Sequence, residues 1–285
     1  MIDVARTVAE VRDRVAEARR EGQVVGFVPT MGALHEGHAA LIRRARPECG
    51  YLVVSIFVNP TQFAPGTDFD RYPRDLAGDS AKAEAAGADL ILAPSVEEMY
   101  PPGDSTLVEV TGRLVDCLCG PHRPGHFRGV TTVCARLFNI VGADKAYFGE
   151  KDYQQLLVIE QMVRDLRFPL EVVPVPTARE ADGLAISSRN AYLSREERRA
   201  AAALSRGLFA ARDLFRSGER EARALLSEAR RVIESEPRVR VQYIELRDAE
   251  TLEELQRLDR RAVLALAAFV GEARLIDNVI MSATA

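Results

Sequence analysis

Short apolar runs alternate with helical segments through the first 175 residues, and this alternation constrains the fold more than any other feature. In the run at 24–28 apolar and polar residues do not alternate, which is typical of a strand buried on both faces. Strands are expected at residues 24–28, 51–58, 89–93, 106–110, 145–149 and 171–175, and helices at 4–21, 38–45, 75–86, 130–141 and 152–166. Such βαβ units form parallel sheets with right-handed crossovers. The pattern predicts an α/β fold with a Rossmann-like doubly wound parallel sheet, in which ligands bind beyond the carboxyl ends of the strands.

The pattern changes after Pro176. A helical stretch rich in Arg, Ala and Glu follows and continues to about Glu234. Three strands are then expected, at 239–248, 262–270 and 273–281, with a hairpin-length turn between the last two. We therefore expect two domains: a Rossmann-like nucleotide- and substrate-binding domain at 1–176, and a smaller α+β domain at 177–285.

Charge and composition argue against several classes of function. The net charge is −4 and the pI is about 5.7, whereas a dominant nucleic-acid surface needs a basic face. No apolar stretch approaches the length of roughly 18 residues that indicates a membrane span, and the first 20 residues lack the apolar run of a signal peptide. Four cysteines are too few for a disulfide scaffold. We expect a cytoplasmic protein that binds neither nucleic acid nor a membrane.

The strongest local signal is the sequence PTMGALHEGH at residues 29–38, between a buried strand and the start of a helix. Two of the four histidines in the chain, His35 and His38, lie in it. A helix N-terminus offers unpaired N–H groups and a positive dipole end, and imidazoles beside it can donate to phosphate oxygens. We interpret the loop as a phosphate site. The alternatives are a structural turn with surface histidines, or a zinc site that lacks its remaining ligands.

Two further loops carry groups suited to anions. Only three of the 38 basic residues are lysine, and one of them, Lys151, follows a strand and opens a helix in FGEKDYQQ (148–155). A compact ammonium at that sheet edge can bridge phosphates, although an exposed helix start is the simpler interpretation. Ser187, Ser188 and Arg189 form an anion-competent loop near the domain junction, or alternatively a polar linker.

Polar side chains also follow the second strand, in SIFVNPTQF (55–63). Asn59 and Gln62 lie at the same sheet edge and could hydrogen-bond a polar substrate, unless Asn-Pro only stops the strand. Asp68, Asp70 and Asp79 could hold Mg²⁺, with solvated surface carboxylates as the alternative. The other two histidines lie in a loop rich in Gly and Pro (120–130), which either frames an anionic ligand or is a rigid surface loop.

The full set of motifs resembles a known family. The His-x-Gly-His loop and the Ser-Ser-Arg loop are similar to the signature pair of the nucleotidylyltransferase superfamily. In order and spacing, six motifs together resemble the bacterial pantoate–β-alanine ligases: PTMGALHEGH, SIFVNPTQF, RYPR, RPGHFRGV, FGEKDYQQL and READGLAISSRN. This resemblance spans nearly the whole chain and includes the two-domain layout.

The resemblance implies a reaction in two steps. Pantoate and ATP give pantoyl adenylate and pyrophosphate, and β-alanine then displaces AMP to give pantothenate, with Mg²⁺ on the departing pyrophosphate. It also implies a homodimer, with which the apolar run SIFV is compatible, and a C-terminal domain that closes over the adenylate as a lid. The alternatives are a nucleotidyltransferase that stops at a nucleotidyl product, and a nucleotide sensor without activity.

Site residues are implied in the same way. Catalytic roles fall on His35, Lys151 and His38, the last as proton donor. Gln62 and Gln155 contact pantoate, Gln62 also adjoins the β-alanine site, and Asp79 is the magnesium ligand. The ATP contacts are Met31, Gly32, Ala33, Leu34, His35, Glu36, Gly37, His38, Gly149, Glu150, Lys151, Asp152, Ala178, Ile186, Ser187, Ser188 and Arg189. The family often has Val where Ala178 stands and Met where Ile186 stands, and these apolar exchanges bear on packing around adenine rather than on chemistry.

Overall fold

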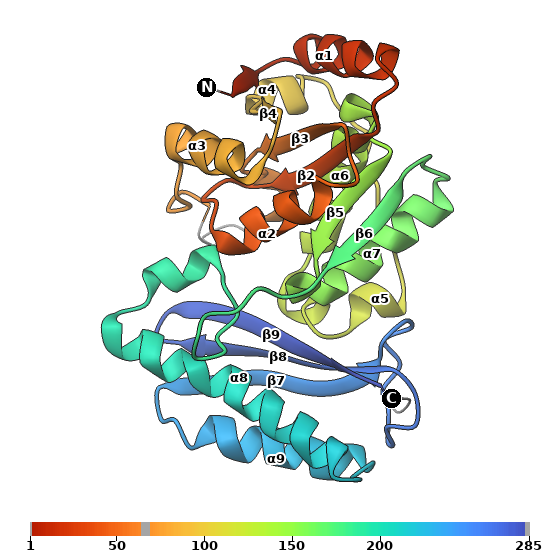
Figure 1. The fold of residues 1–285 in the computed structure, drawn as a ribbon. Helices are drawn as coiled ribbons and strands as arrows, with labels where there is room; N and C mark the ends of the chain where they lie inside the picture. The colour runs from red at the N-terminus through yellow and green to blue at the C-terminus, as the bar shows by residue number, and fades with distance from the viewer. Residues whose placement is uncertain (1, 64–68, 283–285) are drawn as a thin grey trace. The chain divides into compact units, whose positions relative to one another are not determined.

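A computed structural model describes residues 2–63 and 69–282, which fold into two compact units (Figure 1). We call Met1–Val110, Arg123–Glu150 and Gln155–Pro176 the N-terminal unit. Thr111–His122, Lys151–Gln154 and Thr177–Ala285 form the C-terminal unit. Each unit has its own sheet and its own hydrophobic core.

The N-terminal unit is built on six parallel strands in the order β1-β4-β3-β2-β5-β6. Their bounds are Asp3–Ala5 (β1), Val25–Thr30 (β2), Tyr51–Ile56 (β3), Leu90–Leu92 (β4), Lys145–Gly149 (β5) and Glu171–Val175 (β6). The chain proceeds from β2 outward to β3 and β4 on one side, and β5 and β6 lie on the other side. The predicted doubly wound parallel sheet is confirmed, and its topological switch point lies between β2 and β5.

Helices cover both faces of this sheet. They are α1 (Val8–Arg20), α2 (Glu36–Ala45), α3 (Leu76–Ala86), the short α4 (Val96–Met99), α6 (His126–Val141) and α7 (Tyr153–Asp165), with single 3₁₀ turns at Pro60–Gln62 (η1) and Glu150–Asp152 (η3). Successive strand residues point to opposite faces. Phe27 therefore packs in a core with α1, α6 and α7, whereas Val28 packs in a second core with α2 and α3.

Two expectations for this unit were wrong. Residues 106–110 form no strand, because their polar groups bond to α6: the Val108 amide donates to Thr132 Oγ1 at 3.0 Å, and the Thr131 hydroxyl donates to the Val108 carbonyl. The first helix begins only at Val8, after the Thr7 N-cap, and the residues before it form β1. The run SIFV (55–58) begins in β3, an interior strand paired with β2 and β4, and its part in an interface stays a prediction.

The C-terminal unit contains the antiparallel sheet β7-β8-β9, with β7 at Val239–Asp248, β8 at Ala262–Val270 and β9 at Ala273–Met281. These bounds and the Gly271–Glu272 hairpin agree with the prediction. Helices α8 (Arg195–Arg216) and α9 (Ala222–Glu234) pack together on one face (Figure 1). The expected single helical stretch is divided at Gly218, whose φ of 112° is readily adopted only by glycine.

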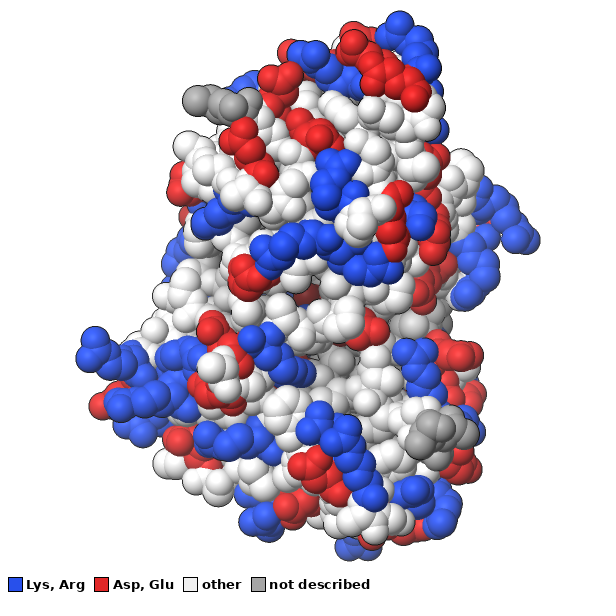
Figure 2. Space-filling model, in the orientation of Figure 1, with Lys and Arg blue, Asp and Glu red and all other residues white. Residues whose placement is uncertain are grey.

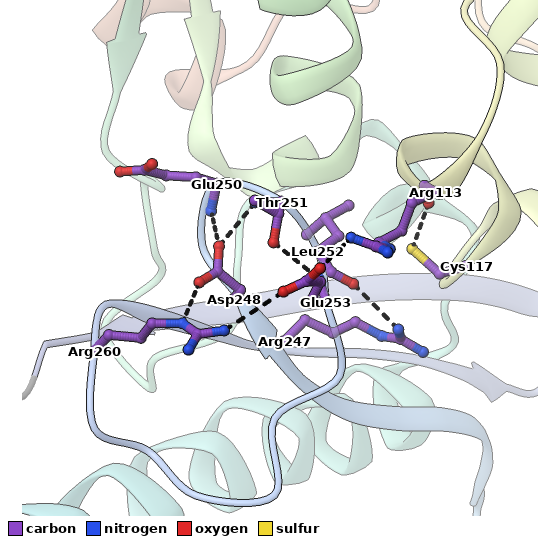
Figure 3. Close-up of polar contacts among 9 residues, drawn as sticks. All are labelled: Arg113, Cys117, Arg247, Asp248, Glu250, Thr251, Leu252, Glu253 and Arg260. Atoms are coloured by element: carbon purple, nitrogen blue, oxygen red, sulfur yellow. Dashed lines mark hydrogen bonds and ion pairs between the residues drawn. The ribbon is translucent and has the colours of Figure 1, made fainter.

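Side-chain contacts tie the segment Thr111–His122 to this unit. The Gln154 amide accepts from the Cys119 N–H at 2.9 Å and donates to the carbonyls of Cys117 and Leu114. Arg113 forms an ion pair with Glu253 in the turn after β7 (Figure 3). That turn is held by Asp248, which accepts from the Glu250 and Thr251 amides and from Arg260. The segment also includes α5 (Arg113–Asp116) and a 3₁₀ turn at Gly120–His122 (η2).

Basic and acidic side chains are mixed over the face seen in Figure 2. Within the described ranges, none of the helices has the length and apolar character needed to cross a bilayer. The four cysteines, Cys49, Cys117, Cys119 and Cys134, are all buried thiols.

Candidate active site

The switch point of the N-terminal sheet is where the two strongest motifs begin. β2 and β5 are neighbouring parallel strands, so their carboxyl ends meet at one edge. The loop PTMGALHEGH leaves β2 at this edge, and FGEK leaves β5 there. The fold therefore places the start of both motifs at the position where doubly wound sheets bind ligands.

The paired histidines form the N-terminus of α2. His35 is the N-cap residue, and its Nδ1 accepts the Gly37 amide at 3.1 Å, while His38 Nδ1 accepts the His35 amide at 3.3 Å. The rings stack with centroids 4.0 Å apart. An imidazole nitrogen that accepts a hydrogen bond carries no proton, so each neutral ring has its proton on Nε2. The helix start thus carries two Nε2–H donors beside its positive dipole end, which suits an anion.

The backbone before these histidines is held by a buried carboxylate. Gly32 and Ala33 have φ values of 81° and 50°. Asp79 of α3, only 1% exposed, accepts the Ala33 amide at 2.8 Å with one oxygen and the Leu34 amide at 2.7 Å with the other. Lys82, one helical turn further, donates to the Leu34 carbonyl at 2.8 Å. Helix α3 therefore fixes the shape of the loop that leads to His35.

These contacts do not fit the magnesium site expected at Asp79. Both oxygens of the carboxylate already bond to amides, and its burial leaves little room for the waters that Mg²⁺ retains. Asp70 is exposed, and Asp68 lies outside the described residues. Within residues 2–63 and 69–282, no three His, Cys, Asp or Glu side chains form a group that could hold a metal ion.

Gln62 joins a second motif to the same loop. Its Nε2 lies 3.0 Å from the Met31 sulfur, and its Oε1 accepts from Asn59 at the same distance. Asn59, 1% exposed, also donates to the Gly129 carbonyl and accepts from the Tyr100 hydroxyl. Asn59 is thus saturated by protein contacts and orients Gln62, whereas the sequence offered both amides as substrate contacts, with a strand stop at Asn-Pro as the alternative.

The Gly- and Pro-rich loop has a packing role at this site. His126 is buried at the start of α6 and bonds through Nδ1 to the Gln62 carbonyl at 3.0 Å, and Arg123 bonds to its Nε2. A Cβ on Gly129 would lie 2.4 Å from the Thr61 carbonyl oxygen, so only glycine allows α6 to approach η1 this closely. Of the two interpretations of this loop, these contacts favour the rigid one.

Two pockets open beside this network in the N-terminal unit. One, of about 270 Å³, is lined in part by Met31, Gly32, Phe57 and Arg74. The other, of about 530 Å³, is bounded by α2 and α3 and has His35 and Lys82 in its wall. The loop between β2 and α2 therefore has space for a small ligand on two sides.

The remaining predicted residues lie mostly in the C-terminal unit. Lys151 is in η3, with its Nζ 3.6 Å from Asp152, and its side chain is 19% exposed. The Ile186 amide donates to the Ala178 carbonyl at 3.0 Å, which places these two apolar residues side by side. Ser187 caps a 3₁₀ turn (η4, Ser188–Tyr192), and its hydroxyl accepts the Arg189 amide. Gly149, Glu150 and Gln155 belong to the N-terminal unit, and all three are half-buried.

Sequence reasoning missed several residues that hold these groups. Arg179 forms a bidentate ion pair with Asp277 of β9, and Asn278 donates to the Lys151 carbonyl. The only signal in the sequence was a pair of polar residues inside an apolar strand, ARLIDNVIM. Lys82 was marked only by the scarcity of lysine.

A helix start suited to an anion, at the switch point of a doubly wound sheet, is typical of nucleotide-binding α/β enzymes. Comparison with known proteins gives the family: residues 3–280 match the model of the pantoate-beta-alanine ligases. The chain belongs to this family. It is an ATP-dependent ligase that joins pantoate to β-alanine through a pantoyl adenylate. This assignment excludes both the nucleotidyltransferase and the sensor considered above.

Similar proteins support the assignment over the full chain. The pantothenate synthetase of Moorella thermoacetica is 54% identical over 280 residues, which cover 98% of this chain and 99% of the relative. A crystal structure of the Thermus thermophilus pantothenate synthetase has a TM-score of 0.93 at 50% identity, covering 98% of this chain and 99% of the other. A Francisella tularensis pantoate-beta-alanine ligase has a TM-score of 0.81 at 33% identity, covers 98% of each chain and is described as a complex with beta-gamma ATP and beta-alanine.

Proposed function

We propose that adenylate formation takes place at the carboxyl edge of β2 and β5, with His35, His38 and Lys151 as the groups that touch the ATP phosphates. The observation that carries this proposal is the pair of Nε2–H donors at the N-terminus of α2, each fixed by an amide bond to its Nδ1. The remaining ATP contacts are assigned to Met31–His38, Gly149–Asp152, Ala178 and Ile186–Arg189. The ligands named for the Francisella relative support the same substrates here.

The chemistry needs positioned donors more than a covalent catalyst. A carboxylate oxygen of pantoate attacks the α-phosphorus of ATP, and the bond from that phosphorus to the bridging oxygen breaks as pyrophosphate leaves. Negative charge grows on the leaving oxygens, where His35, Lys151 and Arg189 stabilise it and His38 donates a hydrogen bond from Nε2–H. The β-alanine amine then attacks the acyl carbon, the bond from that carbon to the phosphate oxygen breaks, and AMP leaves as the nitrogen loses a proton.

Gln62 and Gln155 are the proposed pantoate contacts. Gln62 is suited to this role because Asn59 and the Met31 sulfur fix its amide group in one orientation. A site built to hydrogen-bond substrate hydroxyls discriminates strongly against analogues that lack them. Replacing pantoate by an analogue without its 2-hydroxyl should therefore weaken adenylate formation far more than replacing one methyl group would.

Mg²⁺ is proposed to enter with ATP. Mg²⁺ is usually bound through substrate phosphates and retained waters, with few protein ligands. This arrangement agrees with the two loop amides that the Asp79 carboxylate already accepts, and it needs no cluster of acidic residues in the described chain. When bound, the ion would neutralise charge on the pyrophosphate.

The roles of the two domains, the oligomeric state and the location are proposed with this function. Residues 1–176 bind nucleotide and pantoate, and 177–285 act as the lid. The homodimer is proposed from the resemblance to the family alone. Four buried thiols suit the reducing cytoplasm.

An omission experiment tests the proposed reaction. With ATP, Mg²⁺ and pantoate present, labelled pyrophosphate should exchange into ATP without β-alanine, because the adenylate forms before the amine reacts. Net AMP formation should need β-alanine as well. Exchange that requires β-alanine, or that proceeds without pantoate, would contradict the order of steps.

A further inference from the structure

Two adjacent polar residues lie buried within the apolar strand β9. Asp277 is 2% exposed and Asn278 is 5% exposed, while Leu275 and Val279 of the same strand pack in the core of the C-terminal unit. Burying a carboxylate or an amide costs free energy unless its hydrogen bonds are made. The partners of this pair therefore indicate what the two residues do.

Asn278 bonds to the turn that carries the candidate lysine. Its Nδ2 donates to the Lys151 main-chain carbonyl at 3.0 Å, across 127 positions of the sequence. Lys151 lies in η3, a single 3₁₀ turn of three residues, whose hydrogen-bond geometry is poor. A fixed amide from a strand of the C-terminal sheet gives that turn a rigid support.

Asp277 bonds to the start of the second ATP segment. Its two oxygens accept from the two terminal nitrogens of Arg179 at 2.8 and 2.9 Å. Arg179 also donates to the carbonyls of Gly183 and Asn278 and forms a β-bridge with Ala185. The next residue after that bridge, Ile186, begins the proposed ATP-contacting run to Arg189.

We propose that Asp277 and Asn278 are positioning residues that hold Lys151 and the Ile186–Arg189 loop in one fixed arrangement for ATP. The two segments are far apart in sequence, and both are bonded to neighbouring residues of one strand. Asn278 acts on Lys151 through its carbonyl, and Asp277 acts on the loop through Arg179. This inference rests on the proposed role of Lys151 and of that loop in binding ATP.

Asn278→Ala tests the proposal, with Val279→Ala as its matched control. Val279 is the next residue of β9 and belongs to the C-terminal core, but it is no part of the proposed contacts. We expect Asn278→Ala to lower pantoate-dependent ATP–pyrophosphate exchange by roughly 10- to 100-fold at saturating substrates, since a misplacement of about 1 Å can cost that much. The KM for pantoate should stay unchanged. Val279→Ala should lower the melting temperature by at least as much and keep its exchange rate.

A double-mutant cycle separates this inference from the proposed function. If Asn278 acts through Lys151, then Asn278→Ala should have little further effect in a Lys151→Ala background. A Lys151→Ala enzyme with near-normal exchange would overturn the proposed role of the lysine itself. Suppose that Lys151→Ala is severely impaired, and that adding Asn278→Ala lowers exchange by the same factor as Asn278→Ala does in the wild type. That result would overturn only the positioning role. Asn278→Ala with a normal exchange rate would overturn it too.

Asn278→Asp gives a second measurement. The carboxylate has nearly the same shape but presents an oxygen to the Lys151 carbonyl in place of the N–H donor. We expect an exchange rate below that of Asn278→Ala, because repulsion displaces the turn further than the loss of one bond. A rate equal to that of the wild type would contradict the contact on which the inference rests.

Discussion

At the scale of single residues, the structure gives the two histidines a defined tautomer. Each Nδ1 is bonded to a main-chain amide of the same helix start, so the rings can donate only through Nε2. The two side chains thus hold the helix start together and, in the proposed site, also donate to the ligand. A single substitution can separate the two roles, provided that it keeps the acceptor and removes the donor.

His38→Asn is that substitution. The asparagine Oδ1 can take the place of Nδ1 and accept the His35 amide, but no group remains at the position of Nε2. We expect the rate of ATP–pyrophosphate exchange to fall by about 10²–10³, the usual effect of losing one transition-state donor, with the melting temperature within a few degrees of the wild type. Exchange and thermal unfolding measure the two effects. A variant that keeps its melting temperature and its exchange rate would exclude His38 from the chemistry.

At the scale of elements, helix α3 acts as a support for the loop between β2 and α2. In Asp79→Asn one of the two loop amides would face an NH₂ group instead of an oxygen. We expect a loss of about 2 kcal/mol of stability, as is usual for a bond to a charged group, and a fall in kcat/KM for ATP of roughly 10- to 100-fold. The concentration of Mg²⁺ that gives half-maximal activity should not change.

Thr7→Ala is the control for Asp79→Asn. It removes the N-cap of α1 in the same unit and should cost about 1 kcal/mol without altering the kinetics. The opposite outcome is that Asp79→Asn raises the Mg²⁺ concentration for half-maximal activity as much as it lowers the activity. The carboxylate would then be a metal ligand.

The end of α2 and the start of β5 are joined by a carboxylate that makes stability depend on pH. Glu48 accepts from Arg44, from the Tyr147 hydroxyl at 2.9 Å and from Lys145 at 3.1 Å, and these bonds lower its pKa from 4.5 to about 2. Between these two values the unfolded chain binds the proton more readily than the folded one. The contribution of Glu48 to stability is therefore complete above about pH 5 and is lost as the pH falls toward 2.

Glu48→Gln should reveal this contribution. Urea unfolding at several pH values should show the variant less stable than the wild type at about pH 7, with the difference shrinking between about pH 4.5 and pH 2. A difference that is constant over this range would contradict the lowered pKa of Glu48. Lys145, in spite of being one of three lysines, belongs to this structural cluster and not to the proposed site.

At the scale of the whole molecule, the sequence predicts the strands and helices better than the side-chain contacts between them. Five strands, β5 to β9, begin and end where the sequence pattern places them, because each is a mostly apolar or alternating run. Residues 106–110 show a similar run but lie extended along α6, where Thr131 and Thr132 saturate Val108. No local pattern can distinguish such a run from a sheet strand.

In the candidate site, too, some residues can be predicted from the sequence and others cannot. The His-x-Gly-His loop and Lys151 are recognisable because each follows a strand, and parallel strands share one edge. Asp79 and Asp277 are not, because their partners lie 46 and 98 positions away and the carboxylates look like ordinary charged residues in sequence. The sequence does not identify the residues whose hydrogen bonds hold the candidate functional groups in place.

A lid function for residues 177–285 makes a prediction for the whole chain. In the segment 179–189 the residues 180–182 are exposed, so a glutamate-specific protease should cut after Glu180 in the free protein. An adenylate is hydrolysed by water, and enzymes that form one protect it by closing loops or domains. We expect ATP with pantoate to slow cleavage of this segment at least tenfold, whereas ATP with β-alanine, which forms no adenylate, should slow it less. Mass spectrometry of the first fragments measures the rate at each site. Cleavage that stays equally fast with ATP and pantoate, while pyrophosphate exchange is normal, would mean that the adenylate forms without closure of the proposed lid.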